Sequence, residues 1–278
     1  MTRPANTLVL VTLLASACAS QGMVDDGTTV SHGRSFEGHL RNSAQLPPQG
    51  EGYVVPKRWV RRGNQHGTDE LITMIVRVAR RVHRETGEAL GVADLSPKMG
   101  GPTPWHRSHQ TGRDVDLLLF AVDRKGNPLP ADAMVPFKED GSSYTVDSHG
   151  KRRSKRYFDA ERNWALIRAV LEEPTVEVQY IYVYEPLKQL MIEHALEAGE
   201  PNGIIEHASA VMEQPVDSSK HDDHIHVRIY CPESDRMFGC RDGWVRPWHK
   251  KLYKYGWEAF VSSAQYVPAA VQVAVLAI

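Results

Sequence analysis

The sequence of 278 residues has no excess charge of either sign and no long hydrophobic segment. Its 33 Lys and Arg residues stand against 34 Asp and Glu residues, which gives a formal net charge of −1 at pH 7. This balance offers no reason to expect nucleic acid or an anionic membrane surface as the partner. The apolar run over residues 8–14 is far shorter than the ~20 residues that cross a bilayer, and no later segment is long and apolar enough. We therefore expect no nucleic-acid partner and no transmembrane span.

Two informative patterns are also missing. No internal repeat is visible, which excludes a solenoid or propeller. The helical His-Glu-x-x-His pattern of many zinc peptidases is absent, so no glutamate base is predicted on that pattern.

Cysteine is scarce, with three residues at Cys18, Cys231 and Cys240. If Cys18 is removed or lipidated during export, two cysteines remain, close enough in sequence to close a short loop. Two free thiols are less favoured in an oxidising compartment, and a zinc site built from two cysteines nine residues apart would have unusual spacing. We predict a disulfide between Cys231 and Cys240.

The N-terminus has the organisation of a secretory signal over residues 1–18. A basic start precedes the apolar run, and Ala15-Ser16-Ala17 supplies small residues for cleavage. The segment also resembles a bacterial lipoprotein box, in which Cys18 becomes the lipidated first residue. Ordinary cleavage and lipidation both stay open, so we expect a periplasmic protein that is either free or an outer-membrane lipoprotein.

Composition then divides the rest of the chain. Residues 19–50 have little apolar periodicity and predict a flexible arm, while residues 51–278 predict one folded domain. Helical spacing of apolar residues predicts helices over 68–86, 159–172 and 186–198, the first opened by Thr68 and ended by Gly87. Strands are expected over 90–95, 115–122 and 176–184, and residues 126–156 are expected to form a surface excursion.

The segment 224–230 is the clearest strand pattern in the sequence. His224, His226 and Arg228 alternate with Ile225, Val227 and Ile229, which places both histidines on one face, opposite the core. Helices and strands mix without regular βαβ alternation, which favours an α+β fold. The apolar residues 267–278 are expected to pack as a terminal strand or helix, with no function assigned.

Histidine clusters indicate metal chemistry. Among 13 histidines, some gather within residues 105–116 beside Asp114 and Asp116, and others within 221–226. A catalytic zinc ion takes three His or carboxylate ligands and keeps one position for water. More donors are available than that, so the surplus histidines can accept a proton or stabilise developing negative charge. Zinc rather than another divalent metal follows from ligand type alone.

The spacing His109-x6-Asp116, with a later His224-x-His226, resembles the metallopeptidase superfamily of lysostaphin-type enzymes, D-Ala-D-Ala peptidases and hedgehog domains. The segments resemble most closely the penicillin-insensitive murein endopeptidases, in an order that fits over roughly residues 30–250. The motifs that carry this resemblance are Ser108-His109-Gln110-Thr111-Gly112, Asp114-Val115-Asp116 and His221-Asp222-Asp223-His224-Ile225-His226-Val227-Arg228, followed by Cys231-Pro232.

This resemblance implies a hedgehog/D-Ala-D-Ala peptidase-like fold, with a small antiparallel sheet carrying the zinc site and helices and long loops around it. It implies one Zn²⁺ per chain, cleavage of the D-alanyl to meso-diaminopimelyl cross-link of peptidoglycan, and residues in named roles. The metal ligands would be His109, Asp116 and His226, the catalytic residues His224 and His221, and the substrate-binding or ligand-orienting residues His106 and Asp114.

Several alternatives stay open. Asp114 shares the face of Asp116 and is an alternative ligand, and the histidine that acts as base is not fixed. Trp105, Arg107 and Arg113 are bulkier or more charged than the family pattern suggests, which puts subsite preference in doubt. A D-Ala-D-Ala carboxypeptidase or dipeptidase would use the same metal site, and a non-hydrolytic zinc module that binds cell wall would keep metal without turnover.

Overall fold

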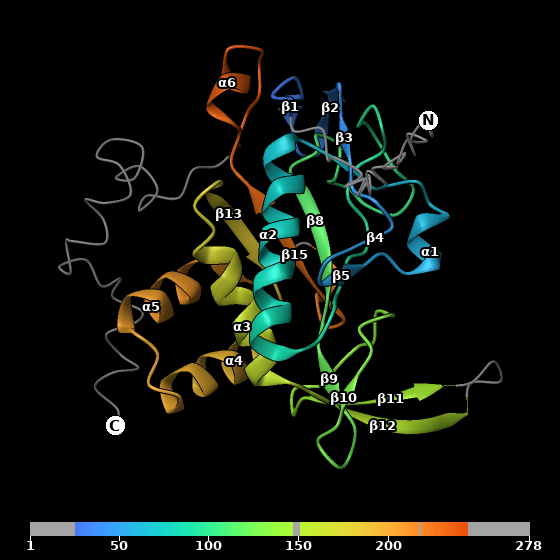
Figure 1. Ribbon diagram of the computed structural model, residues 1–278, viewed down its shortest axis with the longest axis vertical. Helices are drawn as coiled ribbons and strands as arrows, with labels where there is room; N and C mark the ends of the chain where they lie inside the picture. Colours follow the sequence, from blue (N-terminus) through green and yellow to red (C-terminus); the bar gives the residue numbers. More distant parts are fainter. Residues whose placement is uncertain (1–25, 147–150, 217, 244–278) are drawn as a thin grey trace, which may run out of the picture.

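The computed structural model describes residues 26–146, 151–216 and 218–243, and within them the fold is α+β, as the sequence predicts (Figure 1). The helices are α1 Lys57–Val60, α2 Asp69–Thr86, α3 Ala160–Leu171, α4 Glu185–Glu197, α5 Asn202–Val211 and α6 Glu233–Arg236. The strands that precede the central sheet in sequence are β1 Val30–Arg34, β2 Glu37–Arg41, β3 Ala44–Gln45, β4 Gln49–Gly50, β5 Tyr53–Val54, β6 His66–Gly67 and β7 Leu90–Gly91.

A four-stranded sheet with the order β14-β13-β15-β8 forms the centre of the fold. Its strands are β14 Met212–Glu213, β13 Val178–Tyr182, β15 His224–Ile229 and β8 Asp114–Leu118. β15 runs antiparallel to both neighbours, and its register with β8 sets His226 opposite Asp116. This pairing brings together two segments that lie more than a hundred residues apart in sequence.

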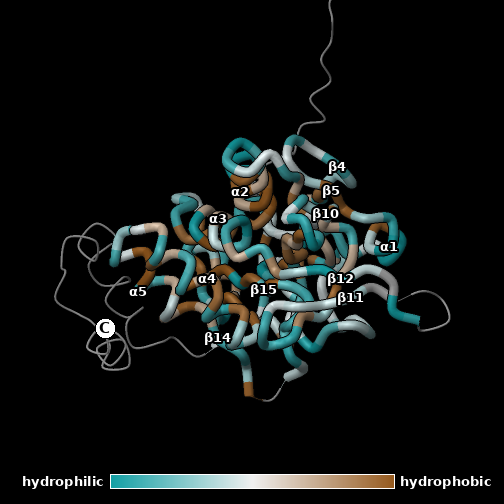
Figure 2. The backbone as a smooth tube through the Cα atoms, turned by 90° about the horizontal axis from the view of Figure 1, so that it is seen from below, coloured by the Kyte–Doolittle hydropathy of each residue, from teal (hydrophilic) through white to brown (hydrophobic). Residues whose placement is uncertain are grey.

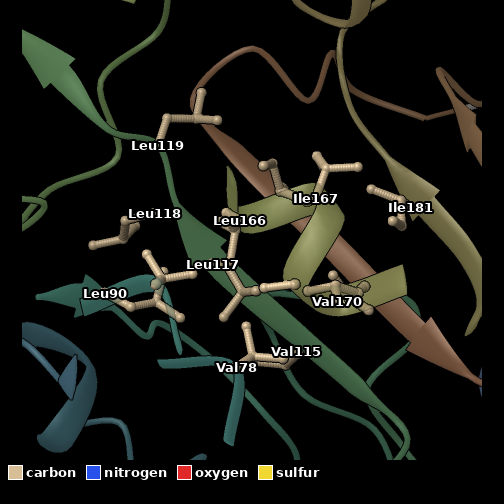
Figure 3. Packing of buried hydrophobic residues seen from close by; sticks show 14 of the residues in the cluster. Val78, Leu90, Val115, Leu117, Leu118, Leu119, Leu166, Ile167, Val170 and Ile181 are labelled. Carbon is tan, nitrogen blue, oxygen red and sulfur yellow. The ribbon is translucent and has the colours of Figure 1, made fainter. Parts of the chain in front are cut away.

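Helices α2 and α3 cover the apolar face of this sheet (Figures 1 and 3). Val115 and Leu117 of β8 pack beside Val78 of α2 and Leu166 of α3 (Figure 3). The hydrophobic stretches gather in the middle of the molecule around α2 and β15, and hydrophilic turns lie outside (Figure 2). Because side chains alternate along a strand, covering one face with helices leaves the other face to polar residues.

Helix α2 begins and ends where the sequence predicts. The Thr68 hydroxyl accepts a hydrogen bond from the Leu71 backbone N–H, and Gly87 ends the helix in the left-handed conformation at φ 77°. Its buried side includes Leu71, Ile75 and Val82. The predicted helices over 159–172 and 186–198 correspond to α3 and α4, whereas α5 was not anticipated.

The expected arm over residues 19–50 differs from the structure in the part that is described. Residues 30–41 form an antiparallel hairpin of β1 and β2, and β3 pairs with β6. Leu40 and Leu46 are almost fully buried. Apolar periodicity is weak here because each of these short strands contributes only one or two side chains to the core. For this reason the amino-acid composition of the segment is similar to that of a flexible linker.

The expected surface excursion over residues 126–156 is partly regular structure. β9 Ala121–Val122, β10 Pro128–Leu129, β11 Ser142–Val146 and β12 Arg152–Phe158 form a second sheet in the order β10-β9-β12-β11. It lies below the central sheet in Figure 1. The basic residues of β12 hid this strand from the sequence pattern: Arg152, Ser154 and Lys155 are exposed, and Phe158 is buried.

The predicted disulfide joins Cys231 and Cys240. It closes the segment that contains α6, and this segment attaches to β1 through a hydrogen bond from Gly33 N to Gly239 O of 3.1 Å and one from Arg241 N to Gly33 O of 2.9 Å.

Some predictions fall on residues outside the described ranges: the signal over 1–18, the lipidation of Cys18 and the packing of the apolar tail 267–278. Within the described ranges, none of the helices has the length and apolar character required to cross a bilayer.

Candidate metal centre

The polar face of the central sheet carries most of the predicted site residues. Asp114 and Asp116 of β8 lie on it, as do His224, His226 and Arg228 of β15, while Ile225 and Val227 on the other face are fully buried in the core. Direct pairing of His226 with Asp116 and of Arg228 with Asp114 sets these polar residues side by side in two adjacent rows. The alternation seen in the sequence thus gives the orientation that it predicts.

His109 joins these residues from the loop before β8. It is fully buried, and its backbone has φ 64°, a conformation that non-glycine residues rarely adopt. Gly112 follows at φ 74°, where a Cβ would lie 2.7 Å from the Leu40 side chain. Strain of this kind persists where the surrounding structure requires one side-chain position, and it is typical of functional sites.

Three donor atoms converge on one point. His109 Nε2 lies 3.3 Å from Asp116 Oδ1 and 3.2 Å from His226 Nδ1, and His226 Nδ1 lies 3.2 Å from Asp116 Oδ1. Ligands at about 2.0–2.1 Å from a tetrahedral zinc ion are separated by about 3.3–3.4 Å, so this spacing matches the edges of such a tetrahedron.

The tautomers of both histidines follow from their outer partners. His109 Nδ1 lies 3.0 Å from the carbonyl oxygen of Leu95, and His226 Nε2 lies 2.8 Å from Asp114 Oδ1. Each of these ring nitrogens can donate a proton outward, and in the neutral ring the opposite nitrogen then faces the cluster with a lone pair. Two lone pairs and a carboxylate oxygen then meet at 3.2–3.3 Å, an arrangement that a cation stabilises.

Asp116 is suited to hold that cation. It is fully buried, and neither of its carboxylate oxygens has a hydrogen-bond partner among the described residues. Burial by itself would raise the pKa of Asp116, but the nearby His109 and His224 outweigh it and hold the pKa well below the usual range. The carboxylate is therefore ionised.

Asp114 lies behind His226 and does not face the three donor atoms. Its Oδ1 accepts hydrogen bonds from His226 Nε2 at 2.8 Å and from Arg228 Nε at 2.6 Å. Burial opposes the charge of Asp114, but Arg228 and His226 lower its pKa far below the ordinary value. Such outer carboxylates fix the ring orientation of a metal-binding histidine and raise its basicity.

His224 and His221 lie on the side of the cluster toward β13. His224 Nε2 is 3.6 Å from Asp116 Oδ1, and its Nδ1 is 2.6 Å from Asp223 Oδ1. Burial opposes the charged form of His224, but Asp116 and Asp223 raise its pKa above the ordinary value. Burial, with the neighbouring His226 and His224, lowers the pKa of His221 to about 3, so this ring is neutral.

His106 lies on the opposite side of the cluster. Its ring lies against that of His109, with the ring centroids 4.2 Å apart and the planes tilted by 33°. Its Nε2 is 2.9 Å from Asp94 Oδ2 and 3.7 Å from Asp116 Oδ2. Donor atoms of His106, His109 and Asp116 all lie within 4.8 Å of one another, so this second set also has the spacing to hold a metal ion.

Asp94 and Arg62 lie beside the cluster but are not predicted from the sequence, and Arg113 lies elsewhere. Asp94 is a buried carboxylate in an otherwise apolar stretch. A single acidic residue within such a stretch is the sequence feature that could have marked it as a functional residue. Arg113 directly precedes β8 and continues the alternation of Val115, so its side chain points away from the metal centre. Its guanidinium bonds Ser31 Oγ, the carbonyl oxygens of Ile229 and Arg241, and Asp242. This arginine joins parts of the fold, so it gives no ground for doubting the subsites.

Comparisons with known proteins agree with the motifs. A family model described as penicillin-insensitive murein endopeptidase matches residues 31–247. Proteins named penicillin-insensitive murein endopeptidase from Haemophilus influenzae and Klebsiella pneumoniae are similar to this chain. The first is 28% identical over 210 residues, which cover 75% of this chain and 66% of the relative. The second is 27% identical over 207 residues, covering 74% and 68%. The matched region thus spans about two thirds of these relatives' length.

Proposed function

The chain belongs to the penicillin-insensitive murein endopeptidase family, and from this premise we propose that it is a zinc-dependent endopeptidase that hydrolyses the D-alanyl to meso-diaminopimelyl cross-links of bacterial peptidoglycan. The relatives' names supply the substrate class, and the site supplies the chemistry.

The observation that supports a metal peptidase best is the convergence of His109 Nε2, Asp116 Oδ1 and His226 Nδ1 at 3.2–3.3 Å, with the other nitrogen of each imidazole bonded to an outer acceptor. We propose these three side chains as the ligands. Two nitrogen donors and one carboxylate are the ligand types of catalytic zinc. His106 is the less suitable ligand, because its Nε2 is engaged by Asp94.

When bound, zinc activates water and polarises a carbonyl group at neutral pH. The protein's own residues then move protons and orient groups. His224, held at Nδ1 by Asp223, presents Nε2 toward the cluster and is proposed to accept and return a proton. His221, neutral and 5.1 Å from the ring of His224, is proposed to donate a hydrogen bond to the developing oxyanion.

The proposed substrate places the protein in the periplasm, and the signal expected over residues 1–18 would deliver it there. We also propose that the domain shares the hedgehog/D-Ala-D-Ala peptidase-like fold, supported by a small sheet with helices on one face and the site on the other. Lipidation of Cys18 is not part of this proposal.

The test uses purified dimeric D-alanyl-diaminopimelyl muropeptides and mass analysis of the products. The protein is expected to convert dimers to monomers, to lose this activity with a chelator and to regain it with added zinc. His226→Ala should abolish both cleavage and stoichiometric zinc binding, because one of three ligands is gone. His83→Ala, an exposed histidine of α2, is the matched control and should leave both unchanged.

Intact dimers beside bound zinc would contradict the endopeptidase. Release of terminal D-alanine from monomeric pentapeptides would then identify a carboxypeptidase, and no product from either substrate would leave a zinc module that only binds.

A further inference from the structure

A guanidinium group lies beside the metal centre, on the side opposite His224 and His221. Arg62 Nη1 donates a hydrogen bond to Asp94 Oδ2, and the same oxygen lies 2.9 Å from His106 Nε2. His106 Nε2 is in turn 3.7 Å from Asp116 Oδ2. Three successive contacts therefore connect Arg62 with the carboxylate at the centre of the cluster.

The position of Arg62 is fixed from two sides. Asp94 is fully buried, so its ion pair with Arg62 holds the guanidinium against the interior of the protein. The ring of Trp105 stacks against it at 4.7 Å, and this indole is 48% exposed. The Arg62 side chain keeps 16% of its surface exposed. A guanidinium stacked on an aromatic ring and held by one carboxylate is preorganised, and its other N–H groups can receive an anion.

A purely structural account explains only part of this arrangement. Neutralising Asp94 requires one cation, and His106 already donates to the same oxygen. A lysine or a buried arginine would serve that purpose. A half-exposed tryptophan over a partly exposed guanidinium, next to a catalytic cluster, is instead the arrangement of a binding surface for a small planar anion.

The proposed substrate carries such an anion at the required place. In a D-alanyl to meso-diaminopimelyl cross-link, the carbon atom attached to the scissile amide nitrogen also bears a free carboxylate. That carboxylate leaves with the amine, so it lies within a few bonds of the scissile carbonyl carbon.

We propose that Arg62, positioned by Asp94 and Trp105, binds the free carboxylate next to the scissile amide and so selects cross-links in which that group is charged. This inference rests on the proposed endopeptidase function. It makes Arg62 a specificity residue, Asp94 a positioning residue, and Trp105 one wall of the subsite.

The experiment compares two dimeric muropeptides that differ only in this group, one with the free carboxylate and one with its primary amide. Wild-type protein should cleave the free-acid dimer with a kcat/KM on the order of 10- to 100-fold higher, the usual effect of losing a charged hydrogen bond. Arg62→Ala should bring the two values within about twofold by slowing the acid alone, and Arg62→Lys should restore part of the preference.

Arg61→Ala is the matched control, since Arg61 is the exposed neighbour of Arg62 and should keep the wild-type preference. Zinc content and thermal unfolding show whether each variant is folded.

If the wild type cleaves both dimers equally well, this inference is wrong, but the proposed endopeptidase function stands. This comparison requires only the wild-type protein. Equal slowing of both dimers by Arg62→Ala also overturns it, because that is the effect of a structural role. Cleavage of neither dimer by zinc-loaded wild type overturns the proposed function itself.

Discussion

At the scale of single residues, the site depends on side chains that never touch the metal position. His226 turns its Nδ1 toward His109 and Asp116 because its Nε2 donates to Asp114, and Asp114 stays charged because Arg228 donates to it. The proposed ligand His226 is thus oriented by a carboxylate that Arg228 keeps ionised. The metal affinity of the site should reflect the whole chain of contacts.

Asp114→Asn tests this dependence. The amide oxygen can still accept from His226 but has lost its charge, so zinc affinity should fall about 10- to 100-fold. Excess zinc should restore much of the activity. Competition with a chromophoric chelator measures the affinity, with Asp132→Asn, an exposed aspartate, as control. Unchanged affinity in Asp114→Asn would show that the Asp114 charge does not support His226.

At the scale of elements, α5 contributes a buried titratable group far from the chemistry. Burial lowers the pKa of His207 to about 4, against about 6.5 in an unfolded chain. Between pH 4 and pH 6.5, the unfolded state therefore binds a proton at His207 that the folded state does not bind. His207 contributes stability that is fully present above pH 6.5 and is lost as the pH falls from 6.5 to about 4.

His207→Gln removes this titration. Between pH 7 and pH 4 the wild type should lose about 3 kcal/mol more unfolding free energy than the variant. Urea unfolding of both proteins in the presence of a chelator measures the difference, since metal release then affects neither. Parallel pH profiles for the two proteins would rule out the effect.

At the scale of the whole molecule, the first and last described segments, β1 and the segment that contains α6, are in contact. The disulfide segment bonds β1 through Gly33, Asp235 accepts from Ser31 N at 2.7 Å, and buried Arg113 links Ser31 to Asp242. These contacts hold the first hairpin against the sheet that carries the site. The disulfide constrains only the segment from Cys231 to Cys240 in the unfolded chain.

Replacing Cys231 and Cys240 together by serine should lower the unfolding free energy by roughly 2–3 kcal/mol, as expected for a short closed loop. Zinc should still bind at low temperature, because none of the three proposed ligands lies in the loop. Thermal unfolding of the variant and of reduced wild type should give matching midpoints. If the oxidised wild type proves no more stable than the variant, the disulfide contributes no stability and the prediction is wrong.

The sequence by itself determined the elements whose signals are local. The helix over 68–86 follows from its spacing and caps, the orientation of His224 and His226 from strand alternation, and the disulfide from the shortage of other cysteines. The two motif segments also indicated the family that residues 31–247 match. Each of these depends on neighbours within a few residues.

Only the tertiary structure decided what depends on distant partners. β15 pairs with β8 across more than a hundred residues, and this pairing sets three donor atoms at 3.2–3.3 Å. The same applies to the burial of Leu46, to Arg113 as a link within the fold and to Arg62 beside Asp94. Local patterns carry no information about these contacts, because free energy from packing and charge pairing arises only when the chain brings remote groups together.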